Sequence, residues 1–276
     1  MQKILFHDVD GCLNTADGAA LPFEFAQLLT SQKDALRALG VSLDDSDIDI
    51  MVLNTGRSLE ATIFIAEAIG SVKLRYVIAE HGALGYSMLD KNDLDFAYHA
   101  RSVPQLGSAY ATVNKIESLV NWYVSEGANL LANEIGHMVV ASSKRANLTL
   151  KIPDGFSGDN MMMVVRKLIE TRSPVAGDKL VYHHSASDGY LDVMAEVDKG
   201  DAVQIICHLE SQRSLHTYAV GNGTNDLPMF RQVDSCVGPS NSDDLLLSYL
   251  KQNGGLISEH SFIDATLSLL KTLNRR

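Results

Sequence analysis

Residues 3–12, KILFHDVDGC, place two aspartates directly after an apolar run. The apolar part, residues 4–6, has the length and composition of a short buried strand. Asp8 and Asp10 follow it two positions apart, where like charges repel each other and resist removal from water. Taken alone, the segment fits a strand ending in a polar Asp-Gly turn as well as it fits a functional pair of carboxylates. The remainder of the chain decides between the two.

Short apolar runs alternate with helical patterns in the two outer parts of the chain. Strands are predicted at residues 3–8, 47–56, 75–82, 216–223 and 235–238, and helices at residues 25–40, 58–70, 199–212, 243–252 and 262–273. Gly40 and Gly70 stand where the first two helices are expected to end. Alternating strands and helices predict an α/β fold, with a parallel, Rossmann-like core sheet that helices cover on both faces.

The middle of the chain has a different pattern. Helical patterns at residues 109–127 and 158–173 alternate with strand-like pieces at residues 137–152 and 179–197. Helices on a small antiparallel sheet would form a separate α+β unit, inserted into the parallel domain. We therefore expect a core domain of residues 1–83 and 188–276 and an inserted cap domain of residues 84–187.

Composition and charge narrow the class of partner. The formal net charge of −11 disfavours broad contact with nucleic acid or anionic lipid, which both need a basic surface, but leaves room for a small anionic substrate. Three widely spaced cysteines predict neither a disulfide framework nor a zinc site. Without a signal-peptide pattern or an apolar run of membrane-spanning length, the chain is expected to be cytoplasmic, with no membrane contact. A monomer and a homodimer are equally compatible with the sequence.

Polar residues follow the predicted parallel strands at the edge where such sheets bind ligands. The first strand ends in Asp8 and Asp10, the second in residues 54–57 (NTGR), and a late strand in residues 221–226 (GNGTND). Lys199 opens the helix that precedes the late strand. Brought to one edge, these groups supply carboxylates for a divalent cation, a hydroxyl and amides for phosphate oxygens, and a balancing cation.

This ordered set resembles the motifs of the haloacid dehalogenase superfamily. The four motifs are similar to DVDGC at residues 8–12, MVLNTGR at 51–57, Lys199 in AEVDKGDAV, and GNGTND at 221–226. The stretches IAEHGA and NDLPMF match as well, and the large insert before Lys199 resembles the α/β cap of the Cof-type and sugar-phosphatase branch. The resemblance covers the whole chain in order, which favours the functional interpretation of the two aspartates.

The resemblance implies catalytic roles for Asp8, Asp10 and Lys199. The residue matching Asp8 attacks phosphorus and forms an aspartyl-phosphate, a form of carboxylate nucleophilic catalysis. The residue matching Asp10 protonates the leaving alkoxide and then accepts a proton from the incoming water. The matching lysine balances negative charge in the site.

The resemblance also implies a bound Mg²⁺ and a phosphate site. The implied metal ligands and supports are Asp8, the carbonyl of Asp10, Asn222 and Asp226; the implied phosphate contacts are Thr55, Gly56, Lys199 and Asn225. Mg²⁺ is a hard ion that accepts carboxylate, carbonyl and water oxygens. Arg57 is expected either to reach the phosphate or to pair with an acid on the following helix.

Two positions depart from the family pattern. Asn222 stands where the family has Asp, and Cys12 stands where it usually has Thr. A carboxamide oxygen can still bind Mg²⁺, but it brings no negative charge, so weaker metal binding is expected. Cys12 is expected to be a small packed residue, because nothing nearby marks a reactive thiolate.

The function expected from the resemblance is a Mg²⁺-dependent phosphomonoesterase acting on a small phosphorylated metabolite, either a sugar phosphate or a phosphoglycolate-like acid. Asn222 motivates an alternative, a catalytically weakened phosphometabolite-binding or regulatory protein. A mutase-like sugar phosphotransferase would use the same site. In the cap, Lys144 and Arg145 are candidate substrate contacts, and an exposed polar strand edge is the equally weighted alternative.

A second phosphatase pattern is set aside. Cys207 and Arg213 have the Cys-x5-Arg spacing of cysteine-dependent phosphatases, whose chemistry needs an anion-cradling loop. The segment between them has no glycine and continues a helical apolar pattern. It is therefore predicted to be structural.

Overall fold

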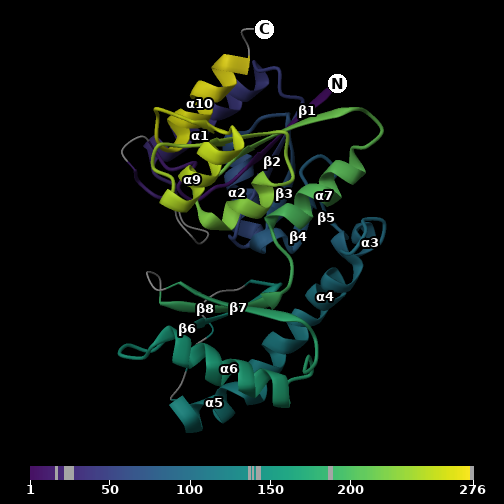
Figure 1. Cartoon of the computed structure of the whole chain (residues 1–276), viewed down its shortest axis with the longest axis vertical. Helices are drawn as coiled ribbons and strands as arrows, with labels where there is room; N and C mark the ends of the chain where they lie inside the picture. The colour runs from purple at the N-terminus through teal and green to yellow at the C-terminus, as the bar shows by residue number, and fades with distance from the viewer. Residues whose placement is uncertain are drawn as a thin grey trace. The chain divides into compact units, whose positions relative to one another are not determined.

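The computed structural model of the chain describes residues 1–15, 18–21, 28–135, 138, 140, 144–185 and 189–273 (Figure 1). The chain forms two compact units, Met1–Phe96 with Asp198–Arg276, and Ala97–Val197. The chain passes between the units at residues 96/97 and 197/198. Both points lie later in the chain than the predicted ones at residues 83/84 and 187/188. The first does so because two short strands after residue 83 extend the sheet of the core unit.

The core unit is built on an eight-stranded sheet of order β11-β10-β9-β1-β2-β3-β4-β5. Its strands are β1 (Gln2–His7), β2 (Ile50–Asn54), β3 (Leu74–Ala79), β4 (Leu84–Ser87), β5 (Asn92–Leu94), β9 (Leu215–Val220), β10 (Ser235–Gly238) and β11 (Leu256–Ile257). From β11 to β3 all neighbours are parallel, whereas β4 and β5 join the edge antiparallel. The α/β fold with a mainly parallel sheet is thus confirmed, and the antiparallel edge was not predicted.

The central strands are apolar throughout because both faces of the sheet are covered. Every residue of β2 is buried, and in β1 only Lys3 is more than marginally exposed. The pairing of Leu5 with Met51 and of Phe6 with Val52 puts these apolar residues in register at the middle of the sheet. Such continuous runs are the expected pattern for parallel strands with helices on both sides.

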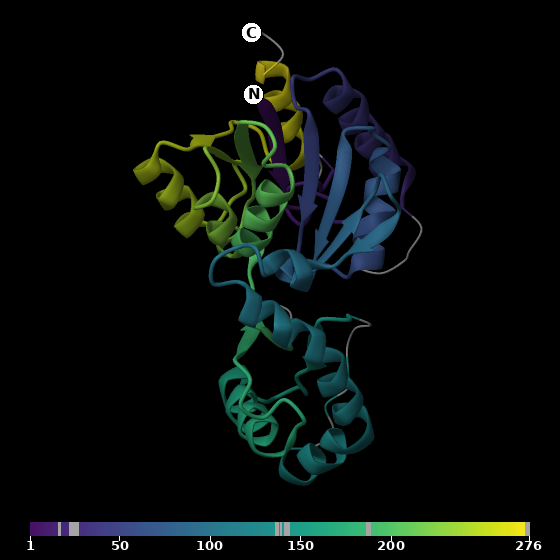
Figure 2. The same ribbon diagram turned by 90° about the vertical axis from the view of Figure 1, so that its right-hand side faces the viewer.

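Helices lie on both faces of the core sheet. They are α1 (Thr30–Asp44), α2 (Leu59–Ile69), α7 (Lys199–Leu209), α8 (Leu227–Phe230), α9 (Asp244–Asn253) and α10 (Phe262–Leu273), with 3-10 turns η1 (Glu80–Gly82) and η3 (Thr224–Asp226). Figure 2 shows the blue helices α1 and α2 on one side of the strands and the green α7 on the other. One continuous apolar cluster joins α1, α2 and α10 to the sheet, as Leu39, Ile65 and Leu270 illustrate.

Gly40 does not end its helix, contrary to the expectation. Helix α1 continues to Asp44, and Gly40 is buried inside it. A Cβ at Gly40 would lie 2.0 Å from the carbonyl oxygen of Ile69, so the glycine allows α1 to approach the end of α2 closely. Gly70, in contrast, ends α2 as predicted, in the left-handed conformation of a helix C-cap. The predicted start of the first helix, residues 25–27, lies outside the described residues.

The second unit packs helices on one face of a small sheet. Its strands, in the antiparallel order β6-β8-β7, are β6 (Asn147–Lys151), β7 (Leu180–Ser185) and β8 (Tyr190–Ala195). Its helices are α4 (Gly107–Trp122), the π-helical stretch η2 (Tyr123–Gly127), α5 (Ala128–Ile135) and α6 (Gly158–Arg172), while α3 (Phe96–Ala100) begins at the crossing. Leu148 and Val193 from the sheet and Ile116 and Val165 from the helices share one buried cluster. The predicted α+β character is therefore confirmed.

Among the residues described, no helix has both the length and the apolar character that crossing a membrane requires.

Candidate active site

Neighbouring parallel strands bring the candidate residues of the core unit to one edge. β9, β1 and β2 are adjacent in the sheet, so their carboxyl ends meet. The backbone N–H of Asp8 donates to the carbonyl of Val220 at 2.9 Å, which fixes the first aspartate against the end of β9. Thr55 follows the end of β2 on the other side. This is the edge of an α/β sheet where ligands bind.

Lys199 joins the first and fourth motifs. Its Nζ donates to Oδ1 of Asp8 at 2.7 Å and to Oδ1 of Asp226 at 2.6 Å, and all three side chains are buried. Burial alone would lower the pKa of Lys199, but the two carboxylates outweigh it and raise that pKa above its usual range. Burial, followed by repulsion from Asp226, raises the pKa of Asp8, and Lys199 opposes that rise. One cation thus holds two carboxylates that would otherwise repel each other.

The sequence DKGD directs Lys199 into the site. Asp198 caps α7, because its side chain accepts hydrogen bonds from the backbone N–H groups of Gly200 and Asp201. The Asp201 side chain in turn accepts from the N–H of Asp198 at 3.1 Å, which completes a capping box. With the helix start fixed, Lys199 occupies the first helical position and is buried rather than solvated.

His7 is a buried neighbour of Asp8 that the sequence reasoning missed. One ring nitrogen contacts the carbonyl oxygen of Asp8, and Nε2 lies 2.6 Å from the hydroxyl of Thr266 on α10. Burial lowers the pKa of His7 to about 4, so the ring is neutral at neutral pH and adds no charge beside Asp8. A histidine directly after an apolar strand was the only available signal.

Asp10 forms an ion pair with Arg57. The guanidinium Nη2 lies 2.5 Å from Oδ1 of Asp10, and Nε lies 3.0 Å from Oδ2. Arg57 is nearly inaccessible, whereas the Asp10 side chain is 40% exposed. Sequence reasoning offered a phosphate or an acid on the next helix as the partner of Arg57, and it did not foresee Asp10. The pair leaves the Asp10 carboxylate held in place, yet open to solvent on one side.

The segment after β2 supplies the hydroxyl of Thr55 and a glycine, Gly56, whose backbone lies close to a neighbouring side chain. Thr55 is fully buried, and its Oγ1 accepts the N–H of Arg57 at 3.3 Å. Gly56 lies directly beneath the imidazole of His81. Asn54 donates from Nδ2 to the carbonyl of Lys199 at 2.9 Å, which ties β2 to the start of α7.

The loop of the fourth motif is held by Asp226. Its Oδ2 accepts the backbone N–H groups of Asn222 and Gly223 at 2.9 and 3.0 Å, while its other oxygen binds Lys199. The carboxamide of Asn222 lies over Gly11, where a Cβ would be 2.2 Å from Nδ2, and its Oδ1 faces the thiol of Cys12 at 3.5 Å. Asn222 is therefore beside the first motif, as the mapping of the four motifs requires.

One predicted residue of the core unit, Asn225, does not join this group, and two further predicted residues belong to the second unit. Asn225 is exposed, its side-chain oxygen lies over Gly223, and in the described part of the chain its carboxamide bonds to none of the other candidates. Lys144 and Arg145 belong to the second unit. There the Nζ of Lys144 lies 3.8 Å from Oδ1 of Asp192, and Arg145 is exposed.

The donor set suits a hard, oxygen-seeking cation. Asp8 has a second carboxylate oxygen, Asn222 has a carboxamide oxygen that lies over Gly11 of the first motif, and Asp10 has a backbone carbonyl. Mg²⁺ takes oxygen ligands of all three kinds. Both oxygens of Asp226 are already used by Lys199 and by the backbone. Over the described ranges, no cluster of three or more His, Cys, Asp or Glu side chains forms a metal site.

Cys12 is buried beside these carboxylates, and burial together with the Asp8 charge raises the pKa of its thiol well above the usual range. A protonated thiol is a poor nucleophile and a poor metal ligand. Cys207 lies within α7, as the sequence predicted, and burial raises its pKa to about 11.

Comparisons with known proteins show the family and the fold of the chain. A family model described as haloacid dehalogenase-like hydrolase matches residues 5–260. A protein of Thermoplasma acidophilum of known structure has a TM-score of 0.64 and 16% identity, with 99% of this chain and 98% of that chain covered. The sucrose-phosphatase of Synechocystis sp. PCC6803, solved with sucrose and phosphate, has a TM-score of 0.61 and 16% identity, with 99% and 98% covered. No curated protein sequence matches the chain. At these identities the structural similarities show the fold.

Proposed function

The chain belongs to the haloacid dehalogenase-like hydrolase family, and on that premise we propose that it is a Mg²⁺-dependent phosphomonoesterase that works through an aspartyl-phosphate on Asp8. The observation that carries the proposal is the position of Lys199, whose Nζ lies within 2.7 Å of Asp8 and 2.6 Å of Asp226. A buried lysine between two carboxylates at a ligand-binding edge balances charge where an anionic group must approach another anion.

In the proposed first step, the free carboxylate oxygen of Asp8 attacks phosphorus and the bond from phosphorus to the leaving oxygen breaks. The Thr55 hydroxyl, the backbone N–H of Gly56 and the Lys199 ammonium hold the phosphoryl oxygens. Asp10, which Arg57 positions, takes up a proton from solvent on its exposed side and gives that proton to the leaving oxygen. In the second step Asp10 takes a proton from water, the water oxygen attacks phosphorus, and the Asp8 carboxylate is released with inorganic phosphate.

We propose that Mg²⁺ is held by the carboxylate of Asp8, the backbone carbonyl of Asp10 and the carboxamide oxygen of Asn222. When bound, Mg²⁺ supplies positive charge between the carboxylate and the phosphate. Asp226 supports the site indirectly, because its oxygens hold Lys199 and the 222–223 backbone. Asn225 is assigned a phosphate contact on the strength of the fourth motif alone.

The proposed substrate is a small phosphorylated metabolite, and a sugar phosphate is favoured over a phosphoglycolate-like acid. A structurally similar protein is a sucrose-phosphatase. We assign substrate selection to the second unit as a cap, with Lys144 and Arg145 as its candidate contacts. The direct test is phosphate release from a panel of phosphorylated metabolites with and without Mg²⁺. Metal-dependent release supports the proposal, and a folded protein that is inert across the panel contradicts it.

Asp10→Asn should lower turnover by roughly 10²–10⁴-fold, the usual contribution of general acid–base catalysis. The substitution leaves the backbone carbonyl of residue 10 in place, so Mg²⁺ affinity measured by calorimetry should change little. Because an alkyl phosphate needs a proton on its leaving oxygen and an activated aryl phosphate does not, the alkyl substrate should lose more activity. Equal losses for the two substrates would contradict the proton-transfer role.

Asn222→Asp should tighten Mg²⁺ binding by at least about tenfold, because a carboxylate at that position adds one negative charge to a site with a single anionic ligand. Calorimetric titration of the metal into the protein measures this without turnover. Asn253→Asp, an exposed change of equal charge on α9, should leave Mg²⁺ binding unchanged. Unchanged affinity in Asn222→Asp would remove Asn222 from the ligand set. An inert wild type that Asn222→Asp activates would instead favour a binding or regulatory protein.

A further inference from the structure

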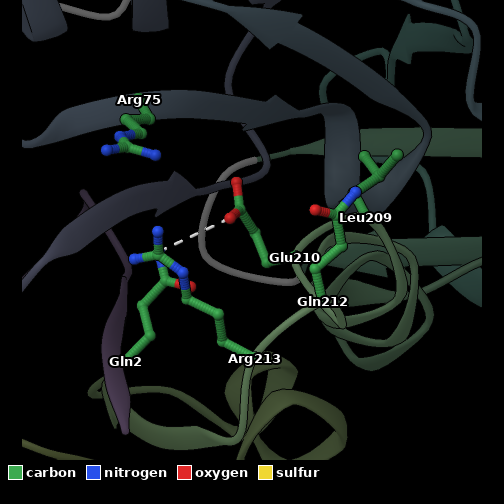
Figure 3. A pocket seen from close by; sticks show the side chains of 6 residues that line it. All are labelled: Gln2, Arg75, Leu209, Glu210, Gln212 and Arg213. Atoms are coloured by element: carbon green, nitrogen blue, oxygen red, sulfur yellow. Dashed lines mark hydrogen bonds between the residues drawn. The ribbon is translucent and has the colours of Figure 1, made fainter.

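A polar pocket of about 260 Å³ lies at the opposite edge of the core sheet from Asp8. Its lining residues are Gln2, Arg75, Leu209, Glu210, Gln212 and Arg213 (Figure 3). Gln2 opens β1, whose other end leads to Asp8, and Leu209 ends α7, whose first residue is Lys199. The pocket and the candidate active site are therefore at the two ends of the same strand and the same helix, within one unit.

A β-bulge places Arg75 in this pocket. Met51 of β2 pairs with Leu74 of β3, but the next residue, Val52, pairs with Tyr76, so Arg75 has no paired residue on β2. An extra residue of this kind re-aims a side chain relative to strict alternation. Arg75 therefore lines the same pocket as Glu210, the residue whose carboxylate Tyr76 contacts.

The side chains that line the pocket carry more positive than negative charge, because two arginines face one glutamate. Glu210 is the one carboxylate in the lining; its Oε1 accepts the hydroxyl of Tyr76 at 2.6 Å and its Oε2 accepts the Gln2 amide at 3.5 Å. Within the described part of the chain, neither Arg75 nor Arg213 has an ion pair to a carboxylate. Figure 3 shows the two guanidinium groups on the same side of the pocket, reaching it from different elements.

The terminus of α7 does not account for both arginines. Arg213 follows the C-terminal end of α7, where a cation is stabilised by the helix dipole and needs no ligand. Arg75 comes from a strand and is aimed by the bulge, which the helix terminus does not explain. Two unpaired guanidiniums beside the Gln2 and Gln212 amides are an unusual feature in a chain of net charge −11.

We propose that this pocket binds the phosphate or carboxylate group of a small metabolite, as a site separate from the candidate active site. Guanidinium forks match the geometry of both oxyanions, and the carboxamides of Gln2 and Gln212 add neutral donors. The volume suits one anionic group with a few further atoms rather than a large cofactor, since ligand pockets typically measure about 300–1,000 Å³. The proposal does not depend on catalysis.

The test is a titration of ¹⁵N-labelled protein at constant ionic strength, with inorganic phosphate in one arm and citrate in the other. The amide signals of Leu209 and Gln212 report on the pocket, and those of Gly56 and Asn222 report separately on the candidate active site. Saturable shifts at Leu209 and Gln212 are expected. A response to phosphate alone, to citrate alone or to both identifies which oxyanion the pocket takes.

Arg75→Gln and Arg213→Gln should each weaken binding at Leu209 and Gln212 by about tenfold, the loss of one charge-assisted contact at a partly exposed site. Arg37→Gln makes the same chemical change on the exposed face of α1 and should bind like the wild type. Spectra otherwise matching the wild type verify the fold of each variant. The proposal is overturned if neither anion gives a saturable shift at these amides, or if both pocket variants bind as tightly as Arg37→Gln.

Discussion

Asp8→Asn should reduce phosphate release by at least about 10⁴-fold, because it removes the only group proposed to attack phosphorus. The carboxamide has nearly the same shape, and it removes a carboxylate whose charge is disfavoured by burial and by Asp226. The fold should therefore survive, with a melting temperature close to that of the wild type. Steady-state hydrolysis of an activated aryl phosphate, followed with and without Mg²⁺, measures the loss.

The matched control is Asp47→Asn, the same chemical change at the half-exposed partner of Lys3. It should leave hydrolysis unchanged. A folded Asp8→Asn protein that keeps a substantial part of its metal-dependent activity would show that Asp8 is not the nucleophile. If Asp8→Asn lost its activity because it unfolds, its melting curve would show the unfolding. The melting curve therefore separates loss of the nucleophile from loss of the fold.

Lys199→Met should destabilise the fold by about 3–5 kcal/mol, the usual cost of leaving a buried charge without its partner. Asp8 and Asp226 would then stay buried together without the cation that joins them at 2.7 and 2.6 Å. The folded-state pKa of Asp8, which burial and Asp226 already raise against the opposition of Lys199, should rise further above its unfolded value. Stability should therefore be retained at pH values below the unfolded carboxyl pKa and decline as the pH rises through the raised folded value.

Urea unfolding of metal-free protein across that pH range measures the effect. Lys199→Met combined with Asp226→Asn should recover part of the stability at neutral pH, because one buried carboxylate then remains instead of two. Lys251→Met, at an exposed position on α9, should have almost no effect. A Lys199→Met variant that is as stable as Lys251→Met at neutral pH would contradict the account of the buried triad.

The placement of the main site residues could be predicted because it depends on local patterns. The apolar run before Asp8 and the capping sequence around Lys199 each fix a strand end or a helix start. In a parallel sheet these ends must meet at one edge. The contact of Lys199 with Asp8 and Asp226 is the three-dimensional result of that rule.

Other contacts could not be predicted, because they depend on packing between distant segments. His7 meets Thr266, which lies 259 positions away, and no local pattern indicates that pair. Arg57, which precedes α2, pairs with Asp10 of the first motif, and no local pattern indicates that contact. The sequence around Gly40 is typical of a helix end, but in the structure this glycine lies inside α1 and allows α1 to pack closely against the end of α2.

The short edge strands β4 and β5 were missed for a related reason. With four and three residues, LGYS and NDL carry too little alternation to be recognised as strands. They belong to the core sheet because β3 offers an open edge for antiparallel pairing. The bulge at Arg75 likewise arises from the register between β2 and β3, which a single strand sequence does not contain.

The central claim is that Asp8 becomes covalently phosphorylated during turnover. It is tested most directly by mixing the protein with Mg²⁺ and an aryl phosphate, quenching with borohydride, and measuring the mass of the peptide that contains residue 8. Borohydride reduces an aspartyl-phosphate to homoserine but leaves a free aspartate intact. We predict homoserine at position 8 only when substrate and Mg²⁺ are both present. Rapid phosphate release with an unmodified Asp8 peptide would contradict the account.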